Sequence, residues 1–350
     1  MTKKIRVLIV DDQSVVRSIL AKGLSEFPEI EVIGKAADAW EARDLIVEHE
    51  PDVVTLDVEM PKMNGLQFLK KLMPQYPLPI IMVSSLTQEG QSTTIEALES
   101  GAVDFVAKPD GTDGSMPKMI SDLYEKIMIA SRVDVSGWKV EKSAPKVKKP
   151  TVKKLNLVSR NHISLIAIGA STGGTTAIIE IISSLPPNMP GIVIVQHMPE
   201  GFTRTFANRL NTLSELEVKE AEDFEEIKPG KVLIAPGDRH LLVEKSTTGH
   251  RVRLSNAEKV TGHRPSVDAM FSSIAELSVA RETLGIILTG MGKDGAVGLR
   301  KMRDRGSRTL GQDEVSCVVY GMPREAYLIG AVEKQVALSQ IPEAIINILK

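Results

Sequence analysis

The sequence predicts an α/β protein of two doubly wound parallel-sheet domains joined by a basic linker. The chain has 350 residues, more than one typical domain. Short apolar runs alternate with segments of helical spacing, as in parallel sheets covered by helices. Residues 1–130 hold 13 basic and 21 acidic residues, residues 131–160 hold 9 and 2, and residues 161–350 hold 21 and 22. We therefore predict domains at 1–130 and 161–350, with a flexible linker at 131–160.

Composition narrows the class of protein. Hydrophobic residues make up 42% of the chain and charged residues 25%, which is enough for ordinary cores. The single cysteine, Cys317, excludes a disulfide framework and a site of several thiolate ligands. We find no export signal and no apolar run long enough to cross a bilayer. We therefore expect a cytoplasmic protein that is not inserted in a membrane.

The first domain shows five apolar runs of strand length, separated by segments with the spacing of amphipathic helices. This alternation predicts a five-stranded parallel sheet with helices on both faces. The expected strands are Ile5–Val10, Ile30–Ala36, Val53–Asp57, Ile80–Ser84 and Val103–Ala107, and the expected helices include Val15–Leu24, Ala39–Glu48, Leu66–Leu72 and Thr94–Ser100.

Polar residues stand where four of these strands end, and in a parallel sheet those ends share one edge. They are Asp11 and Asp12, Asp57, Ser84 and Lys108. Carboxylates that converge repel one another unless a cation is present, and oxygen ligands favour Mg²⁺. The lysine and the serine hydroxyl suit the oxygens of a phosphoryl group. The pattern therefore predicts phosphoryl transfer to a carboxylate.

These residues closely resemble the response-regulator receiver domain, in the segments VDD, LDVEMPKMNG, MVSS and DFVAKP. The resemblance implies a flavodoxin-like fold. It implies that Asp57 accepts the phosphoryl group and that Asp11, Asp12 and Asp57 bind Mg²⁺. By the same resemblance Ser84 and Lys108 sense the phosphate, and Phe105 stands at the aromatic switch position.

The second domain is organised around Ile163–Gly174, which reads ISLIAIGASTGG. A buried apolar run, a turn rich in glycine and a helical segment predict a strand, a sharp turn and a helix. Ser171 lies at the turn, in the pattern G-x-S-x-G that marks a nucleophile. Backbone N–H groups at the helix start would face an oxyanion formed there. The structural alternative is a tight or phosphate-binding turn.

Two further apolar runs end next to a histidine and an aspartate. Gly191–Gln196 precedes His197, and Leu284–Thr289 leads into GMGKDG, which contains Asp294. A serine becomes a nucleophile when a histidine takes its proton and a carboxylate holds that histidine. Oxyanion donors could come from residues 290–292, including Met291, or from the turn at Thr172–Gly174, and the sequence does not choose.

Alternatives exist for these assignments. His240 and His263 are rival bases, and Asp294 could instead cap the helix that follows it. The six histidines show no close ligand spacing, which disfavours a zinc site. GASTGG lacks the G-x-G-x-x-G order, which disfavours a dinucleotide.

The second domain resembles the catalytic domain of the chemotaxis receptor methylesterases, in IGASTGG, VIVQHMP, HRPSVD, ILTGMGKDG and GMPREA. The resemblance implies a Rossmann-like α/β hydrolase with no cofactor in this domain. It makes Ser171, His197 and Asp294 the catalytic triad and Met291 a candidate oxyanion donor, while Thr172 stays a candidate from its place in the turn. It also implies glutamyl methyl esters of chemoreceptors as substrate, deamidation of receptor glutamines as a second activity, and a chemotaxis histidine kinase as phosphodonor.

Two hypotheses concern regulation and receptor contact. We expect the unphosphorylated receiver to cover the Ser171 crevice, and phosphorylation of Asp57 to weaken that contact. A basic cluster that could contact an acidic receptor comprises Arg300, Lys301, Arg303, Arg305 and Arg308, although a solvated helix face is the favoured explanation.

Two other classes of protein remain as alternatives. A receiver-linked transcription factor is disfavoured, because the second domain is almost neutral and shows no clear helix-turn-helix, so we expect no nucleic-acid partner. The other alternative is an adaptor that binds receptors without catalysis.

Overall fold

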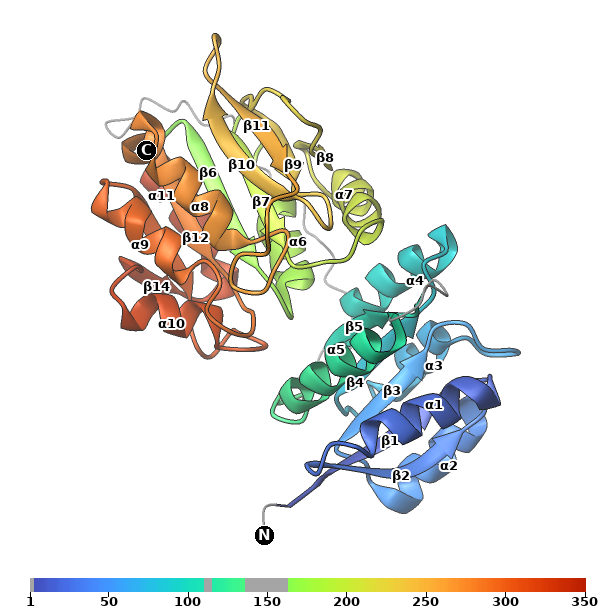
Figure 1. The fold of residues 1–350 in the computed structure, drawn as a ribbon. Helices are drawn as coiled ribbons and strands as arrows, with labels where there is room; N and C mark the ends of the chain where they lie inside the picture. Colours follow the sequence, from blue (N-terminus) through green and yellow to red (C-terminus); the bar gives the residue numbers. More distant parts are fainter. Residues whose placement is uncertain (1–2, 110–114, 136–162) are drawn as a thin grey trace. The chain divides into compact units, whose positions relative to one another are not determined.

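A computed structural model describes residues 3–109, 115–135 and 163–350 (Figure 1). The chain separates into two compact units, residues 1–146 and 147–350. From residue 136 on, the predicted linker lies outside the described residues. The boundaries at 130 and 160 therefore stay predictions. Within the described ranges, no helix combines the length and hydropathy needed to cross a membrane.

The first unit contains a five-stranded parallel sheet in the order β2-β1-β3-β4-β5, which confirms the predicted fold class (Figure 1). The strands are β1 (Ile5–Val10), β2 (Ile30–Ala36), β3 (Val53–Asp57), β4 (Ile80–Ser84) and β5 (Asp104–Ala107). The helices are α1 (Ser14–Leu24), α2 (Ala39–His49), α3 (Gly65–Leu72), α4 (Gln88–Glu99) and α5 (Ser115–Ala130).

Helix α4 begins six residues before the expected start at Thr94. Its first turn is polar and shows no apolar periodicity, so the pattern missed it. The Thr87 hydroxyl accepts a hydrogen bond from the Gly90 N–H and caps this turn. The helix start therefore depends on a cap that precedes the apolar face.

The second unit contains a seven-stranded parallel sheet in the order β14-β13-β12-β6-β7-β9-β8. Its strands are β6 (Leu165–Ala170), β7 (Gly191–Gln196), β8 (Glu217–Glu220), β9 (Lys231–Ile234), β12 (Thr283–Ile287), β13 (Arg308–Gln312) and β14 (Lys334–Val336). Its α-helices are α6 (Gly174–Ser183), α7 (Phe202–Leu213), α8 (Val267–Ala275), α9 (Ala296–Asp304), α10 (Met322–Leu328) and α11 (Ile341–Leu349).

The structure adds elements that were not predicted from the sequence. Strands β10 (His240–Lys245) and β11 (His250–Ser255) form a separate antiparallel hairpin (Figure 1). The short edge strands β8 and β14 have four and three residues, too few for a clear alternating pattern. Helix α8 ends at Ala275, and a 3₁₀ turn, Ser278–Glu282, follows it.

Strand order fixes where chemistry can occur in both sheets. In the first sheet the order reverses between β1 and β3, and in the second β6 lies between β7 and β12. In open parallel sheets, a crevice forms at the carboxyl ends of the strands where the chain changes direction. Asp11, Asp12 and Asp57 lie at the ends of β1 and β3, and Ser171, His197 and Asp294 follow β6, β7 and β12.

Candidate functional site

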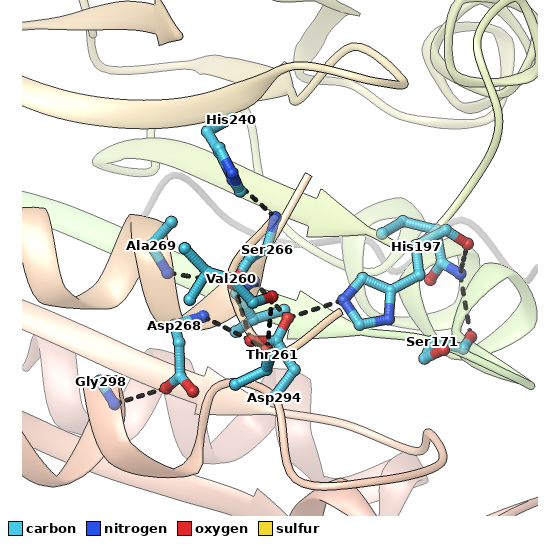
Figure 2. Close-up of polar contacts among 12 residues, drawn as sticks. Ser171, His197, His240, Val260, Thr261, Ser266, Asp268, Ala269, Asp294 and Gly298 are labelled. Atoms are coloured by element: carbon cyan, nitrogen blue, oxygen red, sulfur yellow. Dashed lines mark hydrogen bonds and ion pairs between the residues drawn. The ribbon is translucent and has the colours of Figure 1, made fainter. Parts of the chain in front are cut away.

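Three adjacent central strands end at the residues singled out in the second domain. Ser171 follows β6 directly, His197 follows β7, and the loop after β12 carries Asp294 to the start of α9. The His197 Nε2 atom lies 2.8 Å from the Asp294 Oδ2 atom. Figure 2 shows the His197 ring between Asp294 and Ser171. The fold thus gathers the three side chains in one place.

Asp294 is buried and accepts five hydrogen bonds (Figure 2). Its Oδ1 atom accepts from the Thr261 hydroxyl at 2.5 Å, the Ser266 hydroxyl at 2.7 Å and the Asp268 N–H at 3.1 Å, and its Oδ2 atom accepts from His197 and from the Val267 N–H at 2.7 Å. Burial raises the pKa of Asp294, but the bonds from His197, Thr261 and Ser266 outweigh it and hold the pKa well below its usual range. The carboxylate is therefore ionised at neutral pH.

The helix-cap interpretation of Asp294 is wrong for the helix that follows it. Helix α9 has no side-chain cap at its N-cap residue, Gly295. Asp294 instead binds the Val267 and Asp268 N–H groups in the first turn of α8. The positive end of that helix dipole adds to the stabilisation of the carboxylate.

The hydrogen bonds of His197 define which ring nitrogen can act as a base. An ionised carboxylate only accepts, so Nε2 carries the proton directed at Asp294. The Nδ1 atom is buried, and no described residue bonds to it. Within the described ranges no hydrogen bond joins the Ser171 hydroxyl to His197, although such contacts are often long in free enzymes. Nδ1 is therefore the candidate base, and its role stays a prediction.

The two rival histidines have different surroundings. His240 is buried, its Nε2 atom donates to the Glu258 carbonyl at 3.0 Å, and its Nδ1 atom accepts from the Ser266 N–H at 3.2 Å. With both nitrogens engaged, His240 is structural. The His263 ring stacks on the His197 ring, with centroids 3.9 Å apart and planes at 14°. His263 therefore flanks the candidate base.

The loop at residues 290–292 contacts Ser171. A Cβ atom on Gly290 would lie 2.7 Å from the Ser171 Cβ, so only glycine allows this approach. The Gly290 N–H donates to the Val319 carbonyl, whereas the Met291 N–H has no acceptor among the described residues. The loop therefore favours Met291 as oxyanion donor, and Thr172 stays the second candidate.

The first domain brings its acidic residues together around a lysine. Ligand oxygens of Asp11, Asp12 and Asp57 lie within 4.8 Å of one another. The Lys108 Nζ atom lies 2.9 Å from Asp11 Oδ2 and 2.8 Å from Asp57 Oδ2. Three carboxylates and one ammonium leave an excess of negative charge in a pocket of oxygen donors. This donor set fits a hard divalent cation such as Mg²⁺.

Burial raises the pKa of Asp57 to about 6, because the nearby Lys108 lowers it only in part and Asp11 raises it further. The pairs with Asp57 and Asp11 raise the pKa of Lys108 in spite of its burial. Asp57 is thus a buried carboxylate whose charge a cation would stabilise.

The two other receiver residues, Ser84 and Phe105, contact residues outside this cluster. The buried Ser84 hydroxyl donates to the Gly90 carbonyl at 3.2 Å and accepts from the Thr94 hydroxyl at 2.7 Å, both in α4. The Phe105 ring is buried, and the Lys126 Nζ atom lies 5.7 Å from its centroid. A phosphate-sensing role for Ser84 therefore needs its hydroxyl to exchange these partners, and stays a prediction.

Adding Mg²⁺ should raise the melting temperature of the protein, because the ion would bind the folded acidic cluster and not the unfolded chain. At 100 times its dissociation constant, the ion should add about 2.7 kcal/mol to the free energy of unfolding. Differential scanning calorimetry with Mg²⁺ and then with excess chelator measures this. Asp12→Asn, which removes an exposed ligand, should abolish the shift, and an unshifted wild-type transition would contradict the site.

Three residues that support the site, Thr261, Ser266 and Gln196, were not identified from the sequence. Both hydroxyls bond to Asp294, and the Gln196 amide bonds to the Ser171 carbonyl. Ser266 carried a signal, because a serine before an apolar helical run is typical of an N-cap, and its hydroxyl accepts from the Ala269 N–H. Thr261 and Gln196 carried none, since their partners are distant in sequence.

The basic cluster of α9 and β13 is largely engaged within the domain. Arg300 pairs with Asp304 and donates to the Ile329 carbonyl. Arg303 donates to the Gly330 carbonyl, and Arg308 pairs with Glu333. These contacts favour a structural explanation over the receptor-contact hypothesis.

Comparison with known families matches both units. Residues 166–345 match the family model of the CheB methylesterase, and residues 7–119 match that of the response regulator receiver domain.

Relatives match the chain along its length. A protein-glutamate methylesterase/protein-glutamine glutaminase from Syntrophotalea carbinolica is 51% identical, covering 100% of this chain and 99% of its own. One from Sulfurimonas denitrificans is 49% identical, covering 99% of this chain and 98% of its own. The crystal structure of the Thermotoga maritima CheB methylesterase catalytic domain is 43% identical, with a TM-score of 0.51, over 53% of this chain and 97% of that one.

Proposed function

The chain belongs to the CheB methylesterase family and carries a response regulator receiver domain, and from this we propose that it is a protein-glutamate methylesterase activated by phosphorylation. The substrate is a γ-glutamyl methyl ester on the cytoplasmic helices of a chemoreceptor. The products are methanol and the glutamate carboxylate, and the reaction serves adaptation in bacterial chemotaxis. The same site deamidates specific receptor glutamines, because ester and amide are attacked at the same kind of acyl carbon.

The observation that carries this proposal is the His197–Asp294 pair, whose Nδ1 atom has no partner among the described residues and whose ring lies between Asp294 and Ser171 (Figure 2). His197 Nδ1 takes the proton of Ser171, whose Oγ attacks the ester carbonyl. His197 then returns the proton to the leaving methoxide, and methanol departs. A water molecule attacks the acyl-enzyme by the same route and releases the carboxylate. The Met291 N–H, or that of Thr172, stabilises the oxyanion.

Methanol release from a methylated receptor fragment tests the function. The full-length protein is incubated with this fragment, with and without Mg²⁺ and a small phosphodonor. We expect release that rises when the phosphodonor is present. Absence of release under every condition would overturn the proposal and favour an adaptor or a DNA-binding protein.

Control by the receiver follows from the cluster around Asp57. Asp57 accepts the phosphoryl group from a chemotaxis histidine kinase, while Lys108 and a reoriented Ser84 contact its oxygens. Mg²⁺ held by Asp11, Asp12 and Asp57 would supply positive charge to the phosphoryl group during transfer. The unphosphorylated receiver covers the Ser171 crevice, and phosphorylation weakens that contact.

Replacing Asp57 with asparagine should abolish stimulation by the phosphodonor and leave basal methanol release in place. The amide lacks the nucleophilic carboxylate but keeps the size of the side chain. Stimulation factors of wild type and variant, measured in parallel, check this. Stimulation that persists in the variant would place the phosphoryl group on another residue.

A fragment of residues 161–350 distinguishes occlusion from other forms of control. It should release methanol faster than the unphosphorylated full-length protein, because no receiver covers its site. Equal or slower release would contradict occlusion and leave the esterase proposal intact.

The proposed partners and cellular location follow from the substrate. The partners are methyl-accepting chemoreceptors and their kinase, and the reaction takes place in the cytoplasm, where these receptor helices lie. We propose no nucleic-acid partner. The proposed division into a receiver at 1–130, a basic linker at 131–160 and a catalytic domain at 161–350 agrees with the family matches to residues 7–119 and 166–345.

A further inference from the structure

Gln196 is a buried polar residue that the mechanism above does not use. It is the last residue of β7, next to Ala170 of β6 in the sheet register, and its exposed fraction is 3%. Its Nε2 atom donates to the Ser171 carbonyl at 2.9 Å and to the His197 carbonyl at 3.2 Å. One side-chain amide therefore bonds to the backbones of both the candidate nucleophile and the candidate base.

The orientation of this amide is fixed by its partners. Both neighbouring groups are carbonyl oxygens, so the amino end must face them, and the reversed amide would place three acceptors together. The Oε1 atom is buried and has no hydrogen-bond partner within the described ranges. A buried acceptor without a partner is unfavourable and calls for an explanation. The explanation is that the Nε2 atom at the other end of the amide links the Ser171 and His197 backbones.

Gly174 makes room for the amide. A Cβ atom on Gly174 would lie 2.2 Å from Gln196 Oε1 and 2.6 Å from the Ala170 Cβ. Gly174 has no positive φ, so its backbone conformation does not require glycine. Glycine is required here because the Gln196 and Ala170 side chains occupy the space that a Cβ atom would need. The Gly174 N–H also donates to the Ser171 carbonyl at 2.7 Å, which gives that carbonyl two donors.

We propose that Gln196 is a positioning residue that sets the separation between Ser171 and His197, and that Gly174 serves it by leaving space for its amide. The inference rests on the proposed esterase function. Gln196 contacts neither substrate nor reacting atoms in this scheme, so its loss should affect turnover more than binding. Misplacement of catalytic groups by about 1 Å can lower a rate by about 100-fold.

The main test is Gln196→Met, which keeps the length of the side chain but cannot donate. In the full-length protein with Mg²⁺ and phosphodonor, kcat for methanol release should fall about 100-fold, with KM within about twofold of wild type. The matched control is Thr309→Val, which removes another buried side-chain bond in the same domain, that from the Glu333 N–H at 2.9 Å. It should lower the melting temperature but leave kcat unchanged.

A second variant covers the case in which Gln196→Met does not fold. Gly174→Ala should displace the amide and also lower kcat, and in the double variant the two losses should not multiply. If the wild type is active and kcat is unchanged in Gln196→Met or in Gly174→Ala, this inference alone is overturned. It is also overturned if the kcat losses of the two single variants multiply in the double variant. An inactive wild type would instead overturn the proposed function.

Discussion

Replacing Ser171 with alanine should lower phosphodonor-stimulated methanol release by at least about 10⁴-fold, or about 5.4 kcal/mol in activation free energy. The serine Oγ is the only protein atom in the scheme that forms a bond to the acyl carbon, so its removal stops acyl-enzyme formation. His197 and Asp294 remain paired without it, because their contact does not involve Ser171. Kinetics of methanol release, with circular dichroism to verify folding, measure the effect.

Ser184→Ala is the matched control for this prediction. Ser184 follows the other end of α6, and among the described residues its hydroxyl donates to the Glu180 carbonyl alone, so activity should be unchanged. Full methanol release by Ser171→Ala would show that Ser171 is not the nucleophile. If neither the wild type nor Ser171→Ala releases methanol but both bind the receptor fragment, an adaptor without catalytic activity is the better hypothesis. Binding to duplex DNA that weakens with salt would favour a transcription factor.

Much of the fold could be predicted because central parallel strands are buried on both faces and appear as continuous apolar runs. Strands β1 to β4 and β7 have the predicted bounds. Elements with weaker patterns were missed, such as the polar first turn of α4 and the short edge strand β14. The hairpin β10–β11 was missed because the alternation of apolar runs and helical segments on either side of it favoured parallel strands alone.

The candidate site could be predicted where residues end a strand or lie in the loop that follows it. Ser171, His197 and Asp57 occupy such positions, and the topology brings strand ends together whatever their distance in sequence. Residues that support the site only through side-chain contacts follow no such rule, even where, as with Gln196, they end a strand. The bridge from Gln196 and the bond from Thr261 to Asp294 depend on tertiary packing.

Asp294 is the second residue whose replacement should have a very large effect. All five of its partners are donors, so the site requires an acceptor at both oxygens. In Asp294→Asn the amide must direct an N–H₂ group at some of these donors. If the NH₂ group takes the place of Oδ2, it points at the Val267 N–H, which is also a donor. It then also donates to His197 Nε2, which must act as an acceptor. The proton then moves to Nδ1, which can no longer take one from Ser171.

Asp294→Asn should therefore lower kcat for methanol release by about 10⁴-fold, the loss expected when the wrong histidine tautomer is selected. The matched control is Asp268→Asn, a neighbouring buried aspartate whose Oδ1 accepts from the Gly298 N–H at 2.6 Å. An amide oxygen can still accept that bond, so the loss should stay below about tenfold. Equal losses in the two variants would mean that Asp294 acts by stabilising the start of α8 rather than by holding His197.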